Sequence, residues 1–192
     1  MKNKILTLVI MLPLLIVTII SAAKIFASYN FEKEMKNIAF NQVRLFMSQS
    51  EVEKLYGLGK DLTPGCFGCE LNFIYPDIYL SGRYSDTYDR MKGVNIDHNK
   101  SPKIKRMETA NQSNKIFNIR VGDTFEKAEQ ILRSKGFQKI NSGTFKKKNY
   151  MVEIFDDAEI NDSNTAKHET DDGIIKSMAV SYDVEKDNLI QY

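Results

Sequence analysis

The chain has 192 residues, of which 42% are hydrophobic. A chain of this length and composition can bury the core of one medium-sized domain or two small ones, which excludes an intrinsically disordered protein. Its 27 lysines and arginines nearly balance 25 aspartates and glutamates, for a formal net charge of +2. The overall charge therefore gives no case for a nucleic-acid partner.

The first segment, residues 1–28, is typical of a membrane anchor. Lys2 and Lys4 precede an uncharged apolar run over residues 5–23. At about 1.5 Å per helical residue the run approaches the thickness of a bilayer core, about 30 Å, so it can contact and cross the membrane as one helix. The two lysines favour a cytoplasmic N-terminus, which predicts a single-pass cell-membrane protein with an extracytoplasmic C-terminal domain.

A cleaved secretory signal is the alternative interpretation of this segment. Ser21, Ala22 and Ala23 supply the small residues that a signal peptidase requires, and the protein would then be secreted. The apolar run is longer than the usual hydrophobic region of a signal peptide, about 15 residues at most, and this favours the uncleaved anchor. Either interpretation places the remaining chain outside the cytoplasm.

Residues 29–98 are expected to form a first unit of helices and strands. Apolar residues at helical spacing predict an entry helix over residues 29–45. A period of two then predicts antiparallel strands, with the alternating residues Leu71, Phe73, Tyr75, Ile78, Leu80, Val94, Ile96 and His98.

Residues 116–192 are expected to form a second unit of the same kind. Its predicted helix is followed by extended segments at residues 137–140 and 144–145, and by two alternating runs at residues 150–155 and 174–182. Residues 99–115 are polar and rich in Lys, Asn and Ser, which predicts a linker between the units.

An internal repeat supports this division. Residues 43–56 align without gaps on residues 119–132, and each copy contains a short extended entry, a polar cap and an amphipathic helix. The spacing predicts capping boxes in which Ser48 pairs with Glu51 and Asp123 with Glu126, one residue out of register between the copies. Gly57 and Gly136 follow the helices where a left-handed residue is expected. Chance similarity between two amphipathic helices is the alternative explanation.

The repeated pattern resembles the fold of β-lactamase-inhibitory proteins, with residues 119–124, Ala128, Ile131 and Leu132 carrying the resemblance and residues 43–55 echoing it. It is also similar to the small lipoprotein of the outer-membrane barrel-assembly machinery and to exported proteins of Gram-positive bacteria built on the same unit. The resemblance implies an α+β fold of two tandem helix-plus-antiparallel-meander units, with the helices on one face of the sheet. It further implies non-enzymatic protein binding through the concave sheet face. No binding residue carries over, and the chain lacks tryptophan and a lipidated cysteine after the leader.

Cys66 and Cys69 form the sharpest local motif, because two thiols at this spacing outside the cytoplasm can form a disulfide. They follow Thr63-Pro64-Gly65 and enter a predicted strand rather than a helix N-terminus, which favours a structural disulfide over a redox centre. A thiol-disulfide redox protein remains the alternative function. Zinc would require four ligands, and only His98 and His168 could supplement the cysteines, so no metal and no cofactor is expected.

Four tyrosines, Tyr75, Tyr79, Tyr84 and Tyr88, lie close together in the sequence and would suit a protein-contact surface if exposed on one sheet face. Ordinary strand propensity explains them equally well. Basic residues at 103–106 and 146–148 could bind anionic polymers, although hairpin-tip lysines that discourage edge pairing are commoner. The acidic stretch 156–172 fits no EF-hand spacing and is expected to be a solvated loop.

The sequence contains no GxSxG, HExxH, Walker or GxGxxG motif, which lowers the expectation of an enzyme. The anchor, the repeat and the missing catalytic motifs together predict a membrane-anchored, extracytoplasmic protein-interaction module of the cell envelope. Its expected partners are the membrane, through residues 5–23, and an unidentified envelope or extracellular protein, which such a module could bind or inhibit.

Overall fold

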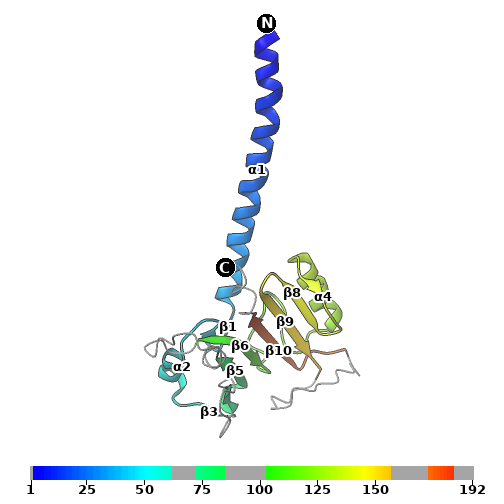
Figure 1. The fold of residues 1–192 in the computed structure, drawn as a ribbon. Coiled ribbons are helices and arrows are strands. Elements are labelled where there is room, and N and C mark those ends of the chain that lie inside the picture. The colour runs from blue at the N-terminus through cyan, green and yellow to red at the C-terminus, as the bar shows by residue number, and fades with distance from the viewer. Residues whose placement is uncertain (1, 62–71, 85–102, 157–172, 184–192) are drawn as a thin grey trace. The chain divides into compact units, whose positions relative to one another are not determined.

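The computed structural model describes residues 2–61, 72–84, 103–156 and 173–183. Two compact units divide the chain, one at Met1–Asn37 and one at Ile38–Tyr192. The second unit has an α+β fold, as the sequence predicted, built around one antiparallel sheet (Figure 1).

The first unit is a single long helix, α1 (Lys2–Asn37, 36 residues). Its segment Leu15–Asn37 is apolar enough and long enough to cross a membrane or to serve as a signal sequence. The boundary expected after Ser28 falls inside this helix.

The entry helix predicted to Leu45 ends earlier, at Asn37. The next residues form a hairpin of β1 (Ala39–Phe40) and β2 (Val43–Arg44). Asn41 and Gln42 have positive φ values of 49° and 71°, which a two-residue turn of type I′ requires. A tight turn therefore replaces the last part of the predicted helix, although the apolar spacing continues through it.

Two helix-plus-meander units follow in tandem. The first contains α2 (Gln49–Tyr56), β3 (Lys60–Asp61), β4 (Asn72–Tyr75), the short 3₁₀ helix η1 (Pro76–Ile78), β5 (Leu80–Tyr84) and β6 (Ile104–Thr109). The second contains α4 (Phe125–Ser134), β7 (Gln138–Lys139), β8 (Thr144–Lys147), β9 (Tyr150–Phe155) and β10 (Ser177–Tyr182). The strand order is β3-β4-β5-β6-β10-β9-β8-β7, so the last strands of the two units pair at the centre.

The predicted linker at residues 99–115 is therefore corrected, because β6 lies within it and joins the two halves of the sheet. Ile104, Met107 and Thr109 are buried. Arg106 and Glu108 alternate with Met107 and Thr109 and point to the opposite face of the strand. Together with Lys105, these charged residues gave the segment its linker-like composition. The strand predicted at residues 94–98 lies outside the described residues.

Matching hydrogen bonds join the residues before each helix to the beginning of the last strand of the same unit, or to the residues just before that strand. Phe46 N–H donates to the Ile104 carbonyl at 2.9 Å, and Gly122 N–H donates to the Ile175 carbonyl at 2.8 Å. Isolated bridges pair Ser48 with Lys103 and Thr124 with Ile174 in the same way. The two units thus share their hydrogen bonding as well as their order of elements.

The observed helix caps lie at equivalent positions of the two copies, whereas the predicted capping boxes were one residue out of register. Ser48 caps α2 in the expected box with Glu51. The cap of α4 is Thr124, whose hydroxyl accepts from Lys127 N–H at 3.2 Å, and not Asp123. The Asp123 carboxylate instead accepts from Arg120 N–H at 2.9 Å. Ser48 and Thr124 occupy equivalent positions in the ungapped alignment.

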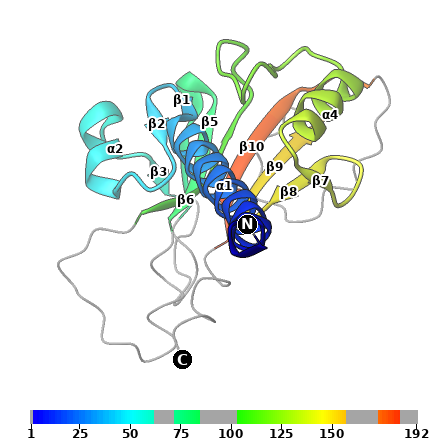
Figure 2. The same cartoon turned by 90° about the horizontal axis from the view of Figure 1, so that it is seen from above.

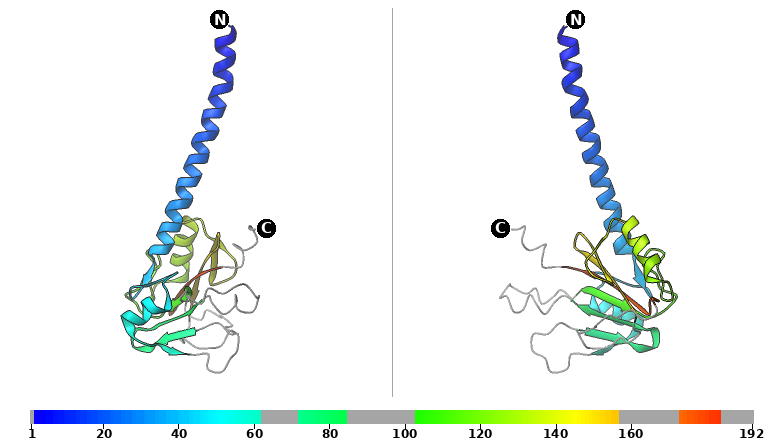
Figure 3. Two further views of the ribbon diagram at one scale, coloured as in Figure 1. Left: turned by 60° about the vertical axis from the view of Figure 1, so that its left-hand side comes forward. Right: turned by 90° about the vertical axis from the view of Figure 1, so that its right-hand side faces the viewer.

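Both short helices contact the same face of the sheet. The Tyr56 ring of α2 lies 5.5 Å from the Tyr75 ring of β4, and the Lys135 carbonyl at the end of α4 accepts from Lys147 Nζ of β8. Figures 2 and 3 show α2 beside the strands of the first unit and α4 beside those of the second. This face carries the core, with Phe73, Leu80, Met107, Phe145, Val152, Ile154, Met178 and Val180 all buried.

Replacing Thr124 with alanine should lower the free energy of unfolding by about 1 kcal/mol, because the first turn of α4 loses its side-chain acceptor. Urea unfolding of the chain in detergent micelles measures this change. Thr124→Ser keeps the hydroxyl and should match the parent protein. A loss of stability in both variants would show that the methyl group of Thr124, and not the cap, matters.

Candidate functional site

The sheet has a second face, which α2 and α4 do not cover. Side chains opposite one another in antiparallel register point the same way, so the pairings assign this face directly. We call it the polar face; its described residues are Lys60, Asn72, Ile74, Ser81, Arg83, Arg106, Glu108, Gln138, Thr144, Lys146, Met151, Glu153, Phe155, Ser177, Ala179 and Ser181. Charged and hydroxyl side chains dominate it.

Small residues line the central strand β10 on the polar face. Ser177, Ala179 and Ser181 are 0%, 0% and 9% exposed. Because these side chains are short, longer side chains from β6 and β9 can lie over the strand and reach one another. The stripe of small residues thus creates the space in which the charged residues meet.

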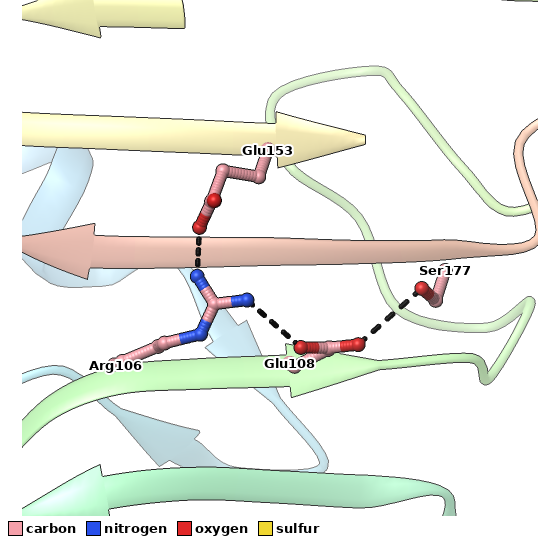
Figure 4. A network of polar contacts seen from close by, with 4 residues as sticks. All are labelled: Arg106, Glu108, Glu153 and Ser177. Carbon is pink, nitrogen blue, oxygen red and sulfur yellow. Dashed lines mark hydrogen bonds and ion pairs between the residues drawn. The ribbon is translucent and has the colours of Figure 1, made fainter. Parts of the chain in front are cut away.

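Arg106 bridges two carboxylates across this space (Figure 4). From β6, its Nη2 donates to Glu108 Oε2 at 2.9 Å, and its Nη1 donates to Glu153, two strands away on β9. Ser177 Oγ donates to the other Glu108 oxygen at 3.4 Å. Each guanidinium nitrogen used has its own acceptor, so the charged groups hold one another in a fixed geometry.

Burial governs the electrostatics of the cluster. Removal from water lowers the pKa of Arg106, and the charge and hydrogen bond of Glu108 oppose this shift. Arg83 stands directly opposite Arg106 on β5 and its charge lowers the pKa of Arg106 further. An arginine nevertheless stays protonated at physiological pH, so the cluster carries permanent charges.

The cluster is suited to recognition. Its two glutamates already accept from one arginine, which leaves them poorly placed to bind a metal ion. Among the residues that the structure describes, no three His, Cys, Asp or Glu side chains gather closely enough to hold one. Fixed charges on a sheet can instead orient a partner through complementary groups.

The predicted tyrosine surface is wrong for two of its members. Tyr75 and Tyr84 are only 8% and 3% exposed, and both lie on the helix-covered face beside Phe73. Their alternation follows the pleat of β4 and β5 towards the core. Tyr79 is 58% exposed, and Tyr88 lies outside the described residues.

Of the other candidate residues, the structure describes only some. Cys66, Cys69, His98 and His168 lie outside the described residues, as does most of the acidic stretch. In the basic run, Lys146 pairs with Asp183 at 2.9 Å and Lys147 donates to the Lys135 carbonyl. These two lysines thus serve contacts within the fold.

The arginine–glutamate cluster was not predicted from the sequence, because β6, the strand that carries Arg106 and Glu108, has the composition of a linker. A signal was present, since Ile104-Lys105-Arg106-Met107 matches Ile175-Lys176-Ser177-Met178. Extending the repeat to this pair would have identified β6 as a strand. Only the sheet order, however, brings Glu153 within reach of Arg106.

Comparisons with known proteins add little. No family model matches the sequence, and no curated protein matches it significantly. One solved structure, an extracellular protein containing a SCP domain from Bacillus anthracis str. Ames, is 7% identical, with a TM-score of 0.40 over 72% of this chain and 44% of that chain. The chain thus spans less than half of that protein, and a likeness this low carries no argument about fold or function.

Arg106→Gln should lower the free energy of unfolding by about 2 kcal/mol, because Glu108 and Glu153 would face each other without their shared cation. Urea unfolding measures the effect. Arg133→Gln is the matched control, since Arg133 pairs with Glu129 on the exposed side of α4 and should cost less than about 0.5 kcal/mol. Equal losses in the two variants would contradict a structural role for the bridge.

Tyr84 should make the domain sensitive to alkali. Burial raises the pKa of Tyr84 in the folded state, whereas an unfolded tyrosine ionises near pH 10. The unfolded state therefore releases a proton first, and stability should fall as the pH rises above about 10. Tyr84→Phe should flatten this decline in urea unfolding measured across alkaline pH. Burial raises the pKa of Tyr75 as well, so part of the decline should remain in Tyr84→Phe. Tyr79→Phe, at an exposed position, should decline as the parent protein does, and a decline equally steep in Tyr84→Phe would refute the assignment.

Proposed function

We propose that the protein is a membrane-tethered, extracytoplasmic interaction module that binds or inhibits an envelope or extracellular protein through its polar face. The observation that carries this proposal is the cluster of Arg106, Glu108 and Glu153 on the face opposite the helices. Its charges are set in position before any partner arrives. Binding to such a surface costs less ordering of side chains than binding to mobile ones.

The tandem arrangement supports the proposal. The described strands of both units form one continuous eight-stranded sheet. A fold like that of β-lactamase-inhibitory proteins, which the sequence resembles, would use such a sheet face for protein contact. We infer that the two units are copies of one ancestral unit, a history that the matching helix caps and hydrogen bonds support.

The N-terminal helix supports the cellular address. A segment that can cross a membrane or serve as a signal precedes the folded domain. Lys2 and Lys4 favour a cytoplasmic N-terminus, which would leave the polar face available outside the cell membrane. A binding module at this address would meet proteins of the envelope or of the surroundings.

Photo-crosslinking in intact cells tests the proposal. A photoreactive amino acid at Ser81 or Met151, both half-buried on the polar face, should give an adduct of the same mass from either position. The matched control carries the probe at Gln130, which is exposed on α4. Adducts that form equally from Gln130, or no adduct reproducible between the two polar-face positions, would defeat the proposal.

A further inference from the structure

Tyr79 has a backbone conformation that tyrosine rarely adopts. It ends the short η1 helix with a φ of 50° and a ψ of 47°, in the left-handed region that favours glycine and asparagine. A bulky side chain is unfavourable there, so another interaction is expected to compensate for the strain. Burial supplies little of this compensation, because the residue is 58% exposed.

Two phenylalanines in the same backbone region show what such compensation looks like. Phe46 and Phe117 have φ values of 69° and 55°. The Phe46 ring lies edge-on to the Tyr182 ring with their centroids 4.9 Å apart, and the Phe117 and Phe137 centroids are 6.0 Å apart. The Tyr79 ring forms no hydrogen bond, ion pair or aromatic contact with the part of the chain that the structure describes. The fold therefore gains little from this ring.

The backbone that carries Tyr79 is held in place. Tyr79 N–H donates to the Pro76 carbonyl at 3.0 Å, and Ala110 N–H, just after β6, donates to the Tyr79 carbonyl at 3.3 Å. The Asn41 side chain donates from Nδ2 to the neighbouring Ile78 carbonyl at 3.0 Å. The turn of the first hairpin, η1 and the segment after β6 therefore meet here, and they present the ring from a fixed support.

Most of the exposed residues in these three segments are polar and uncharged. They are Gln42, Pro76, Asp77, Gln112 and Ser113, of which Asp77 alone carries a charge. A polymer of high charge would require more countercharge than this. An exposed aromatic ring within a polar rim is instead the arrangement of a protein-binding hot spot.

Tyr79 adjoins the polar face. It lies two residues before Ser81, which belongs to that face, and two residues of extended chain span about 7 Å. A partner that covers Ser81 therefore also reaches Tyr79.

We propose that Tyr79 is a hot-spot residue of the partner-binding surface, whose ring enters an apolar pocket of the partner protein while the three turns form the polar rim. This inference rests on the proposed function and adds the chemistry of the partner, a pocket that accepts an aromatic ring. The phenol hydroxyl can form one hydrogen bond at the mouth of the pocket. Recognition, and not folding, then explains why a tyrosine occupies this backbone position.

Urea unfolding of the full chain in detergent micelles separates recognition from folding. Tyr79→Asn removes the ring and introduces a residue that suits the left-handed region, so the urea midpoint should stay the same or rise. Phe117→Asn is the matched substitution at a similar φ, and its midpoint should fall because the contact with Phe137 is lost. A midpoint that falls equally far in Tyr79→Asn would overturn the inference, because the ring would then serve folding.

Photo-crosslinking from Ser81 in intact cells tests the contact itself. Tyr79→Asn should lower the yield of the Ser81 adduct, per molecule of exported chain, about tenfold, as loss of a hot-spot ring does. Tyr79→Phe keeps the ring and should retain most of the yield. Leu58→Asn is the control, since it removes a side chain that is 85% exposed after α2, and it should leave the yield unchanged.

The outcomes separate this inference from the proposed function. An unchanged Ser81 adduct in Tyr79→Asn would overturn the role of Tyr79, and so would an equal loss in Leu58→Asn. The proposed function would survive either result, because the adducts from Ser81 and Met151 in the parent protein would remain. Absence of those adducts from the parent protein would instead defeat the proposed function, and this inference with it.

Discussion

Pairing of β6 with β10 is the constraint on which the rest of the domain depends. These strands end the two units, and their backbone hydrogen bonds join two four-stranded meanders into one sheet. Glu108 faces Ala179 in this pairing, and the two residues occupy equivalent positions after Ile104 and Ile175. The two units are therefore related by an approximate two-fold rotation about this pair. If either unit folded alone, β6 or β10 would be an edge strand without a hydrogen-bonded neighbour on one side.

The same pairing produces the charged cluster through an asymmetry between the units. At equivalent positions β6 carries Arg106 and Glu108, whereas β10 carries Ser177 and Ala179. Long charged side chains from one strand therefore lie over short ones from the other and reach Glu153 on β9. Two identical units would place like charges opposite each other at the centre and repel. This difference between the units makes the central surface both polar and rigid.

The core shows a similar compensation between the units. Gly82 on β5 leaves room for Phe73, since an added Cβ would lie 2.5 Å from that ring. In the second unit Ile154 corresponds to Gly82, and Gly143 corresponds to Phe73. The large and the small residue of the pair have therefore exchanged strands between the two units. The side-chain volume at either position can vary, because the core limits only the combined volume of the two facing side chains.

The sequence by itself determined the apolar N-terminal helix, the two capped helices and most strands, because these depend on local spacing and composition. It failed at β6 and at the tyrosines, since whether a half-polar strand is central, or which face a tyrosine points to, depends on partners distant in the chain. Tertiary structure alone decided that Arg106 on β6 meets Glu153 on β9 across β10. Strand order and register set that meeting, and no local pattern encodes it.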